Sequence, residues 1–338
     1  MTPLQPGVKV GRYEVGEPIR LEPVGALYRV HDAASGARFA LTPLPGVEGD
    51  SDGLYRIERA VRALIRLRHP NLAAVVDVGE FEGTPYVIVA DIPDVTLSDL
   101  MAQGTRLGQE QSLRLLRGAA DGIDAAYREG AVHGELRPEM IFIDGAGNVV
   151  IAGFGLGRLL APRPVTTMAT QYVAPERVMG FAVGPAADVY ALTALAYQLL
   201  AGRSPFDQGP PEALFYAHVH GEPRTPSQVN ADLPREIDQV LLRGLAKDPM
   251  ERWPTCLDFV DALESALSAP PPVPQEVAPE AAIATVAPPR RPTESTRAGP
   301  TRLVIACGLF ALALALLVAI VILHGSPPIT WPAFAPTA

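Results

Sequence analysis

The chain has 338 residues, enough for one large or two ordinary domains with a well-buried core. Its formal net charge of −9 argues against the basic surface typical of nucleic-acid-binding proteins, so no nucleic-acid partner is expected. Two cysteines, Cys256 and Cys307, cannot form a disulfide framework, which indicates a protein of the reducing, cytosolic side. The opening residues lack an apolar core segment, so no secretory signal peptide is expected.

Short strands and one amphipathic helix are predicted for the first third of the chain. Residues 11–30 favour two strands joined by a turn, and a further strand is expected over residues 37–44. A helix is predicted over residues 54–67, because apolar side chains recur there at helical spacing. These side chains are Leu54, Ile57, Val61, Leu64 and Ile65.

The middle of the chain predicts two buried helices and, between them, a loop-and-strand segment. Residues 111–128 carry an apolar stripe at helical spacing. Residues 189–200 are apolar nearly all round, which is typical of a helix buried in a large core. Residues 131–155 predict a short loop (HGELRPEM), two strands around a turn, and the tripeptide GFG.

This loop-and-strand segment resembles the catalytic and metal-binding loops of Hanks-type serine/threonine protein kinases. In that family the two loops read HRDLKPxN and DFG. The residues that match are His133, Leu136, Pro138, Phe154 and Gly155. The residues that replace the family's Arg, Asp, Lys, Asn and DFG Asp are Gly134, Glu135, Arg137, Met140 and Gly153, in that order. The resemblance therefore implies that the family's scaffold is kept and that its catalytic and metal-binding side chains are replaced.

Further segments extend the resemblance over about residues 11–267. They are HPNLAAVVDVGEF, TQYVAPERV, DVYALTALAYQLLAGRSPF and KDPMERWPT. The resemblance implies an α+β, two-lobed kinase-like fold, with an antiparallel β N-lobe (11–90), a hinge (90–93) and a mainly helical C-lobe (94–267). It also implies five residues that stabilise the fold without taking part in catalysis, here called structural pins. They are His133, Phe154, Glu176, Asp188 and Arg252. In the family the last arginine and Glu176 form a buried ion pair, which is costly to break from one side.

The family's nucleotide-binding residues are largely missing. Of its three phosphate-loop glycines, only Gly25 remains. Thr42 replaces the lysine that neutralises phosphates, and the glutamate that pairs with this lysine falls at Ala60. The nucleotide-pocket positions that the resemblance implies are Gly25, Leu27, Ala40, Thr42, Val89, Phe142 and Gly153.

These replacements predict a site that cannot hold a metal–nucleotide complex. Met140 and Gly153 offer no side-chain oxygen, and magnesium requires oxygen ligands. Phe142 is bulky for a position that would face adenine, which predicts a partly filled pocket. We therefore expect no cofactor, no magnesium or other metal, and at best weak binding of ATP.

A pseudokinase is the favoured interpretation, with no catalytic residue and with Glu135 and Arg137 as vestiges that form an ion pair in the loop. The alternative is a weakly active atypical serine/threonine kinase that uses Glu135 as its base, since a positioned base is worth ~10²–10⁴ in rate. A third interpretation is a stable relic without a selected role.

Three threonines, Thr166, Thr167 and Thr170, lie in the segment that active bacterial members of the family phosphorylate. One hypothesis makes them phosphosites used by a partner kinase. The other, which we prefer, makes them solvated loop residues, because Gly134 replaces the arginine that would hold a loop phosphate.

The last part of the chain predicts a tether and a membrane anchor. Residues 268–301 are Pro-rich without periodicity, which predicts a disordered linker. Residues 302–324 predict a transmembrane helix, because Leu303–Leu323 is apolar and uncharged and can cross ~30 Å of hydrocarbon. Arginines cluster before this helix, so the positive-inside rule places the kinase-like domain in the cytoplasm of a single-pass cell-membrane protein. Residues 325–338 are then a short extracytoplasmic tail.

The favoured function is a non-catalytic scaffold or regulator of bacterial serine/threonine phosphorylation. Its expected partners are other protein kinases, their substrates or phosphothreonine-binding adaptors, besides the membrane. Ala311, Ala315 and Ala319 lie on one face of the predicted membrane helix and would allow a homodimer. The abundance of alanine in this chain explains the same pattern equally well, so both interpretations stay open.

Overall fold

A computed structural model describes six stretches of the chain and three single residues. The stretches are 3–20, 26–44, 64–104, 107–154, 171–206 and 209–268, and the single residues are Tyr55, Ile57 and Val61. The chain divides into two units, residues 1–273 and 274–338, and every described residue belongs to the first. The predicted linker beyond Ser268, the membrane helix and the tail lie outside the described residues. None of the helices within the described stretches is long and apolar enough to span a membrane.

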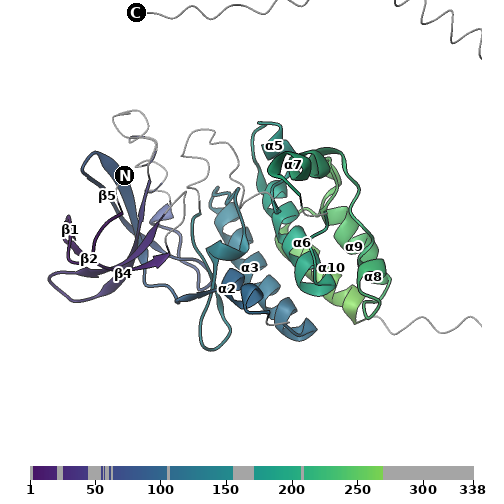
Figure 1. Cartoon of the computed structure of the whole chain (residues 1–338), viewed down its shortest axis with the longest axis horizontal. Helices are drawn as coiled ribbons and strands as arrows, with labels where there is room; N and C mark the ends of the chain where they lie inside the picture. The colour runs from purple at the N-terminus through teal and green to yellow at the C-terminus, as the bar shows by residue number, and fades with distance from the viewer. Residues whose placement is uncertain are drawn as a thin grey trace, which may run out of the picture. The chain divides into compact units, whose positions relative to one another are not determined.

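A six-stranded sheet forms the N-lobe, with strand order β1-β2-β3-β4-β6-β5 and antiparallel pairing throughout (Figure 1). Its strands are β1 (Lys9–Val10), β2 (Tyr13–Arg20), β3 (Leu27–Asp32), β4 (Arg38–Pro43), β5 (Val75–Phe81) and β6 (Thr84–Ala90). The strands β2, β3 and β4 correspond to the three that the sequence predicts over residues 11–44.

Side-chain alternation gives this sheet two buried faces. Tyr28 and Val30 of β3 point into an outer core. The amide of Leu4 donates a hydrogen bond of 3.1 Å to the Tyr28 hydroxyl, so the N-terminal segment covers that core. Leu27 and Ala40 point to the other face, into a core that continues through the C-lobe. One apolar core therefore joins the two lobes.

The predicted amphipathic helix of residues 54–67 is observed at four of the positions described there and ends by Leu64, since residues 65 and 66 form a turn. Tyr55, Ile57, Val61 and Leu64 are all helical. Ile57 and Val61 have no exposed area and belong to the interlobe core, whereas Tyr55 is 65% exposed to solvent. The helical spacing of apolar residues in the sequence thus identified the buried face correctly.

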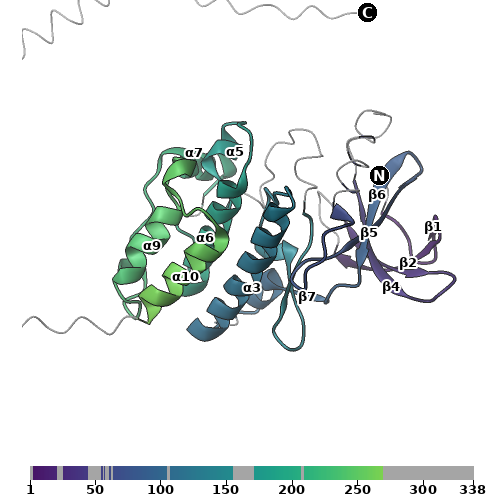
Figure 2. The same ribbon diagram turned by 180° about the vertical axis from the view of Figure 1, so that it is seen from behind.

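A second, three-stranded sheet begins the C-lobe. It consists of β7 (Val95–Thr96), β8 (Ile141–Ile143) and β9 (Val149–Ile151), in that order. Two helices, α2 (Leu97–Ala102) and α3 (Gln109–Arg128), precede β8, and Figure 2 shows α3 between this sheet and the remaining helices. Asn71 attaches the chain that leaves the N-lobe helix to this sheet: its side chain donates to the Val149 carbonyl at 2.8 Å, and its carbonyl accepts from the Ile151 amide at 2.9 Å.

The remaining helices owe their starting points to proline. They are α5 (Pro175–Val178), α6 (Pro185–Ala201), α7 (Pro211–His220), α8 (Pro226–Val229), α9 (Glu236–Gly244) and α10 (Cys256–Leu267), with the 3₁₀ turns η1 (Pro138–Met140) and η2 (Pro249–Glu251). All but α9 and α10 begin with proline, whose fixed φ suits the first turn and whose missing N–H costs nothing there. α10 begins instead after the N-cap residue Thr255, whose hydroxyl accepts from the Asp258 amide at 3.0 Å.

Helix α6 is the centre of the C-lobe, and α3, α9 and α10 pack around it. Its residues from Val189 to Leu195 are buried without exception, as the all-round apolar pattern predicts. The contact with α9 requires a glycine, since a Cβ on Gly244 would lie 2.2 Å from the Thr193 hydroxyl. The two helix backbones therefore approach each other more closely than any side chain would permit.

A buried ion pair fastens α5 to the segment before α10. The guanidinium of Arg252 donates to both carboxylate oxygens of Glu176, each at 2.8 Å. The same guanidinium also donates to the carbonyls of Ala186, Ala246 and Lys247, so all three of its nitrogens make hydrogen bonds. The Arg252 side chain has no exposed area and that of Glu176 only 8%. Such a bidentate pair has strict geometry and fixes the relative positions of these elements.

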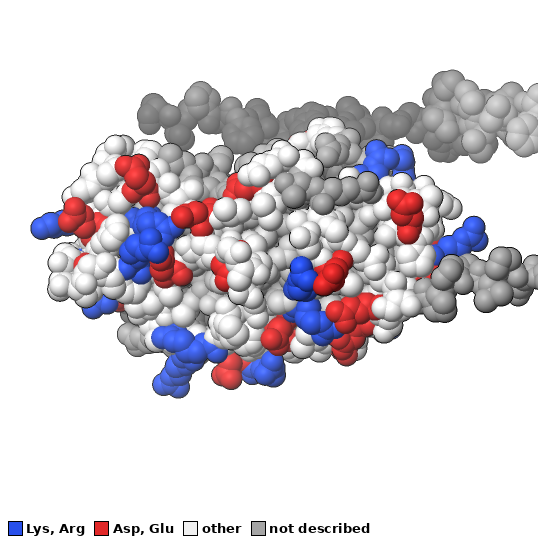
Figure 3. Space-filling view, turned by 90° about the horizontal axis from the view of Figure 1, so that it is seen from below, with Lys and Arg blue, Asp and Glu red and all other residues white. Residues whose placement is uncertain are grey.

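Charges on the surface are mixed in sign. On the face in Figure 3, Lys and Arg side chains lie next to Asp and Glu side chains, without a broad region of one sign. One such group joins α3 to α10, where Arg117 contacts Asp261 and Glu264 at 2.7 and 2.6 Å. Taken together, the antiparallel N-lobe and the helical C-lobe confirm the predicted two-lobed α+β fold.

Replacing Arg252 by Ala is expected to lower the free energy of unfolding by about 3–5 kcal/mol, because the buried Glu176 carboxylate would lose its partner. Urea denaturation of the purified protein measures this change. The matched control is Arg114→Ala, which removes an exposed ion pair with Glu110 and should cost less than about 0.5 kcal/mol. Equal effects of the two substitutions would contradict the structural role of the buried pair.

Candidate functional site

The loop HGELRPEM, residues 133–140, is anchored to α6 by one buried carboxylate. The amides of His133 and Gly134 donate to the two oxygens of Asp188 at 2.8 and 2.7 Å. Asp188 lies in the first turn of α6 and is almost fully buried. Burial raises the pKa of Asp188 to about 7, against the opposing effect of the two amide hydrogen bonds. The sequence-predicted pin at Asp188 thus positions the start of the loop.

His133 links this loop to the end of β9. The Glu135 amide donates to Nδ1 of His133 at 3.2 Å, so Nε2 carries the proton and donates to the Ala152 carbonyl at 3.0 Å. Burial lowers the pKa of His133 to about 4, aided by the charges of Arg137 and Arg177. Its ring also packs edge-on against Phe154, with 4.8 Å between ring centroids. His133 is therefore a neutral packing and hydrogen-bonding residue.

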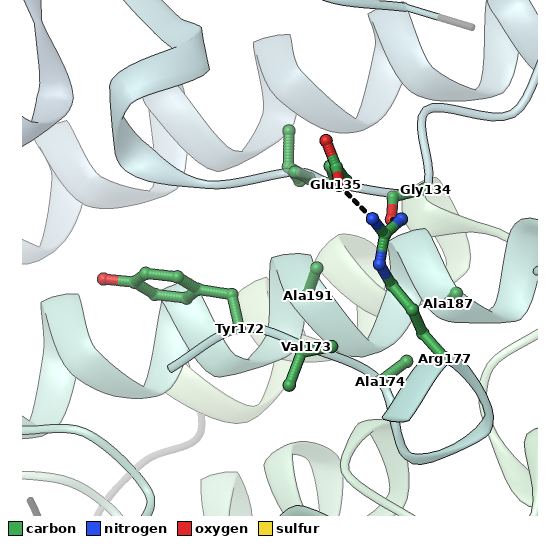
Figure 4. Close-up of a pocket in the computed structure, with 9 residues that line it drawn as sticks. Gly134, Glu135, Tyr172, Val173, Ala174, Arg177, Ala187 and Ala191 are labelled. Atoms are coloured by element: carbon green, nitrogen blue, oxygen red, sulfur yellow. Dashed lines mark hydrogen bonds and ion pairs between the residues drawn. The ribbon is translucent and has the colours of Figure 1, made fainter. Parts of the chain in front are cut away.

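Glu135, the vestigial base in the sequence interpretation, is held by an arginine that this interpretation did not single out. The Arg177 guanidinium forms an ion pair with the Glu135 carboxylate and donates to the Gly134 carbonyl at 2.6 Å (Figure 4). Arg177 belongs to α5, immediately after Glu176. Arg177 is thus a partner of Glu135 from outside the loop; the ion pair expected between Glu135 and Arg137 stays a prediction, and Arg137 is buried immediately before η1.

Gly134 makes room for this arrangement. Its φ of +76° lies in the left-handed region that favours glycine, and a Cβ there would lie 3.8 Å from Nη1 of Arg177. In the kinase family this position carries an arginine. The guanidinium of Arg177 therefore lies next to the space that an arginine side chain at position 134 would enter, but it comes from another part of the chain. Only the tertiary structure reveals this substitution.

A small cleft that is open to solvent lies beside the Glu135–Arg177 pair. The loop residues, the segment before α5 and one side of α6 line it (Figure 4). The lining residues are Gly134, Glu135, Leu136, Tyr172, Val173, Ala174, Arg177, Ala187 and Ala191. Apart from the ion pair the lining is mostly apolar, and the Tyr172 hydroxyl is occupied by a hydrogen bond of 2.6 Å to Gln198.

The two positions that would supply metal ligands lie against each other. The Ala152 amide donates to the Met140 carbonyl at 3.0 Å, which extends the β8–β9 ladder and brings Met140 beside Gly153. A Cβ built on Gly153 would lie 3.3 Å from the Met140 sulfur. A thioether thus borders the space that the carboxylate of an aspartate would enter. These residues do not fit a magnesium–nucleotide complex, since neither side chain provides the hard oxygen ligands that magnesium requires.

The apolar positions predicted for the nucleotide pocket form part of the interlobe core. The exposed fractions of Leu27, Ala40, Val89 and Phe142 are 9, 0, 7 and 1%. Phe142 contributes the largest side chain, as expected from a bulky residue facing this region. Thr42 is half-buried on β4 opposite Val87, with a hydroxyl where the family has an ammonium.

Some predicted residues lie outside the described stretches. They are Gly25, Ala60, Gly155, Thr166, Thr167 and Thr170. The remaining single glycine of the phosphate loop and the three candidate phosphosites therefore stay predictions. The five predicted pins form two groups in the structure. His133 contacts both Asp188 and Phe154 at the loop, and Glu176 of α5 forms an ion pair with Arg252.

Comparison with protein families identifies this arrangement. Residues 23–263 match the model of the protein kinase domain, which is more than two thirds of the chain. The chain belongs to the protein kinase family. The kinase domain thus accounts for the β N-lobe, the hinge and the helical C-lobe described above.

Bacterial serine/threonine kinases are among the relatives of this kinase domain. The probable serine/threonine-protein kinase SCO3848 of Streptomyces coelicolor is 29% identical over 273 residues, which are 77% of this chain and 41% of the relative. Serine/threonine-protein kinase PrkC of Bacillus subtilis is 25% identical over 265 residues, again 77% and 41%. The chain spans less than half the length of the curated relatives it matches.

Solved kinase structures agree with the fold. The crystal structure of the Mycobacterium tuberculosis PknI kinase domain matches with a TM-score of 0.65 and 27% sequence identity. The match covers 78% of this chain and 100% of that chain. A double mutant of the same domain, C20A_R136A, matches with a TM-score of 0.66.

Aspartate at position 153 is expected to destabilise the kinase domain more than aspartate at position 147. Gly153 and Gly147 have similar φ values of +87° and +84°, so both substitutions incur the left-handed penalty of about 1 kcal/mol. Only at Gly153 would the new side chain also meet the Met140 sulfur, because nothing lies within 4 Å of the Cβ position at Gly147.

Urea denaturation of Gly153→Asp and Gly147→Asp, each with and without Met140→Ala, measures this contact. The excess cost of Gly153→Asp should shrink in the Met140→Ala background, while the cost of Gly147→Asp should stay the same. Strict additivity at both positions would show that Met140 does not border the space beside Gly153.

The depressed pKa of His133 predicts a pH-dependent contribution to stability. Because this pKa is about 4 in the folded protein against 6.5 ordinarily, the unfolded chain binds more protons between these values. The contribution of His133 is therefore complete above pH 6.5 and declines by up to about 3 kcal/mol as the pH falls to 4. Asp188 contributes with the opposite sign, since its pKa is raised.

Comparison with His133→Gln separates the two effects, because Asp188 is common to both proteins. The difference in unfolding free energy between wild type and His133→Gln should be largest at pH 7 and should narrow toward pH 4. Denaturation curves at several pH values provide the measurement. A difference that does not change with pH would mean that the pKa of His133 is not depressed in the folded protein.

Proposed function

We propose that this kinase-family protein is a pseudokinase, a non-catalytic scaffold or regulator of bacterial serine/threonine phosphorylation. One observation carries the proposal: Met140 and Gly153, at the two metal-ligand positions of the family, offer no side-chain oxygen, and the Met140 sulfur borders the space beside Gly153. Phosphoryl transfer in this fold depends on metal ions that neutralise the developing charge. Without them, positioning and charge neutralisation fail together.

The other replacements support the same proposal. Thr42 carries no positive charge for phosphates. Glu135 is engaged by Arg177, so the carboxylate nearest the family's base position is bound to a cation. A base alone is worth ~10²–10⁴ in rate, which is far below the acceleration a kinase needs. We accordingly propose that ATP binds weakly at best and that magnesium does not bind.

A protein that keeps the kinase fold but lacks the family's catalytic and metal-binding side chains is suited to a binding role. The buried Glu176–Arg252 pair, the Asp188 anchor and the His133–Phe154 packing keep the C-lobe surface in a defined shape. We propose that this surface binds other kinases, their substrates or phosphothreonine-reading adaptors. We further propose a cytoplasmic kinase domain, joined by residues 268–301 to a single membrane helix at 302–324.

The competing function is a weakly active kinase that uses Glu135 as its base. The observation in its favour is that the Glu135 side chain retains 35% of its exposed area and borders the open cleft. A hydroxyl group entering that cleft would have access to the carboxylate. This function still requires a source of metal ligands other than positions 140 and 153.

A thermal-shift titration with ATP, with and without magnesium, tests nucleotide binding. A ligand that binds the folded protein raises its melting temperature by mass action. Since we propose that ATP binds weakly at best, we expect the melting temperature to change by less than about 1 °C at micromolar ATP. A shift of several degrees that requires magnesium would contradict the proposal.

Autophosphorylation with radiolabelled ATP separates the two functions. The pseudokinase predicts no incorporation by the wild type and none by Glu135→Gln. The competing function predicts incorporation by the wild type that falls about 10²-fold or more in Glu135→Gln. The control is Glu110→Gln on the exposed start of α3, which should behave like the wild type under both functions.

A further inference from the structure

Arg29 lies at the centre of a charge cluster beside the hinge. Its two terminal guanidinium nitrogens contact different carboxylates, Nη1 that of Asp91 and Nη2 that of Asp94. Asp91 directly follows the last residue of β6, and Asp94 lies three residues further on. Arg38 of β4 also contacts Asp91, at 2.8 Å. We refer to Arg29, Asp91 and Asp94 as the Arg29 bridge.

Strand alternation places the Arg29 side chain on the cleft face of the N-lobe sheet. Leu27, two residues earlier, and Ala40, its partner across the β3–β4 ladder, both belong to the interlobe core. Tyr28 and Val30, on either side of Arg29 in the chain, belong to the core on the opposite face. Since β4 lies between β3 and β6, the Arg29 side chain must cross β4 on the cleft face to contact Asp91.

The Arg29 bridge joins the two sheets of the protein. Asp91 follows the N-lobe sheet directly, whereas Asp94 precedes Val95, which pairs with Ile143 in the C-lobe sheet. The Arg29 side chain is only 16% exposed, compared with 60% for Arg38. The side chains of Asp91 and Asp94 are 31% and 80% exposed, so the guanidinium is the buried part of the bridge, and its contacts with two carboxylates fix its orientation. One side chain therefore connects the N-lobe to both ends of the hinge.

We propose that the Arg29 bridge is an autoinhibitory closure of the cleft at the hinge. Arg29 fixes the two lobes relative to each other without a ligand and competes with any flat heteroaromatic ring for the space between β4 and the hinge. The closure goes beyond the proposed function and does not depend on it. It concerns the hinge end of the cleft, whereas the missing charge and metal ligands concern Thr42, Met140 and Gly153.

Hydrogen exchange of the whole 338-residue chain in detergent tests whether the Arg29 bridge restrains the hinge. Arg29→Met keeps the length of the aliphatic stem but removes the charge. Peptides that cover residues 90–97 should then exchange about tenfold faster than in the wild type, because opening of the hinge becomes easier. The matched control, Arg38→Met, removes a contact with Asp91, leaves the Arg29–Asp94 contact in place and should exchange like the wild type.

Peptides from α6 serve as the internal reference, and their protection should be the same in all three proteins if the fold is kept. Unchanged exchange of residues 90–97 in Arg29→Met would overturn the proposal. An equal acceleration in Arg29→Met and Arg38→Met would also overturn it, since the bridge to Asp94 would then have no separate effect.

Binding of a fluorescent adenosine analogue without phosphates tests the closure itself. Because this probe needs neither a metal nor a phosphate-binding cation, the result does not depend on whether the protein is a pseudokinase. We expect Arg29→Met to bind the probe about tenfold more tightly than the wild type, and Arg38→Met to bind it like the wild type. Equal affinity of Arg29→Met and wild type would overturn the closure.

Discussion

The buried carboxylate of Asp188 is the constraint on which the site depends. A carboxylate inside an apolar core is tolerated only if its oxygens find donors, and here both donors are loop amides, those of His133 and Gly134. The orientation of the loop is thereby fixed on α6. From His133 the connection continues through a hydrogen bond to Ala152, one residue before Gly153. A single helix thus positions the catalytic-type loop and the end of β9 together.

On this frame two positions that carry chemically active side chains in the family are glycines, and each lies beside a side chain from another part of the chain. Gly153 leaves a space that the sulfur of Met140 borders, and Gly134 leaves a space that the guanidinium of Arg177 borders. Both glycines have positive φ, so the backbone keeps a conformation that other residues adopt only with strain. The backbone geometry of the site therefore suits glycine at positions 134 and 153, where the family has functional side chains. This combination supports a role in binding more than one in phosphoryl transfer.

The hinge shows a different kind of adaptation. The apolar side chains of the cleft are buried in the interlobe core, and the Arg29 bridge adds an electrostatic link at the edge of the same region. Apolar burial is not directional, whereas a guanidinium between two carboxylates fixes an orientation. Together they hold the lobes by contacts within the protein, at the place where a nucleotide would otherwise connect them.

The sequence by itself determined the family, the two-lobed fold, the buried helix at 189–200 and the loss of oxygen ligands at positions 140 and 153. The family and the fold follow from the resemblance of sequence motifs, the buried helix from its apolar pattern, and the missing oxygen ligands from residue type; none of these requires knowledge of the packing. The partner of Glu135 and the contacts of Arg29 are different, because Arg177 and the hinge aspartates lie 42 and 62 or 65 residues away along the chain. Long, flexible side chains have many reachable partners, and only the folded backbone decides which charges meet.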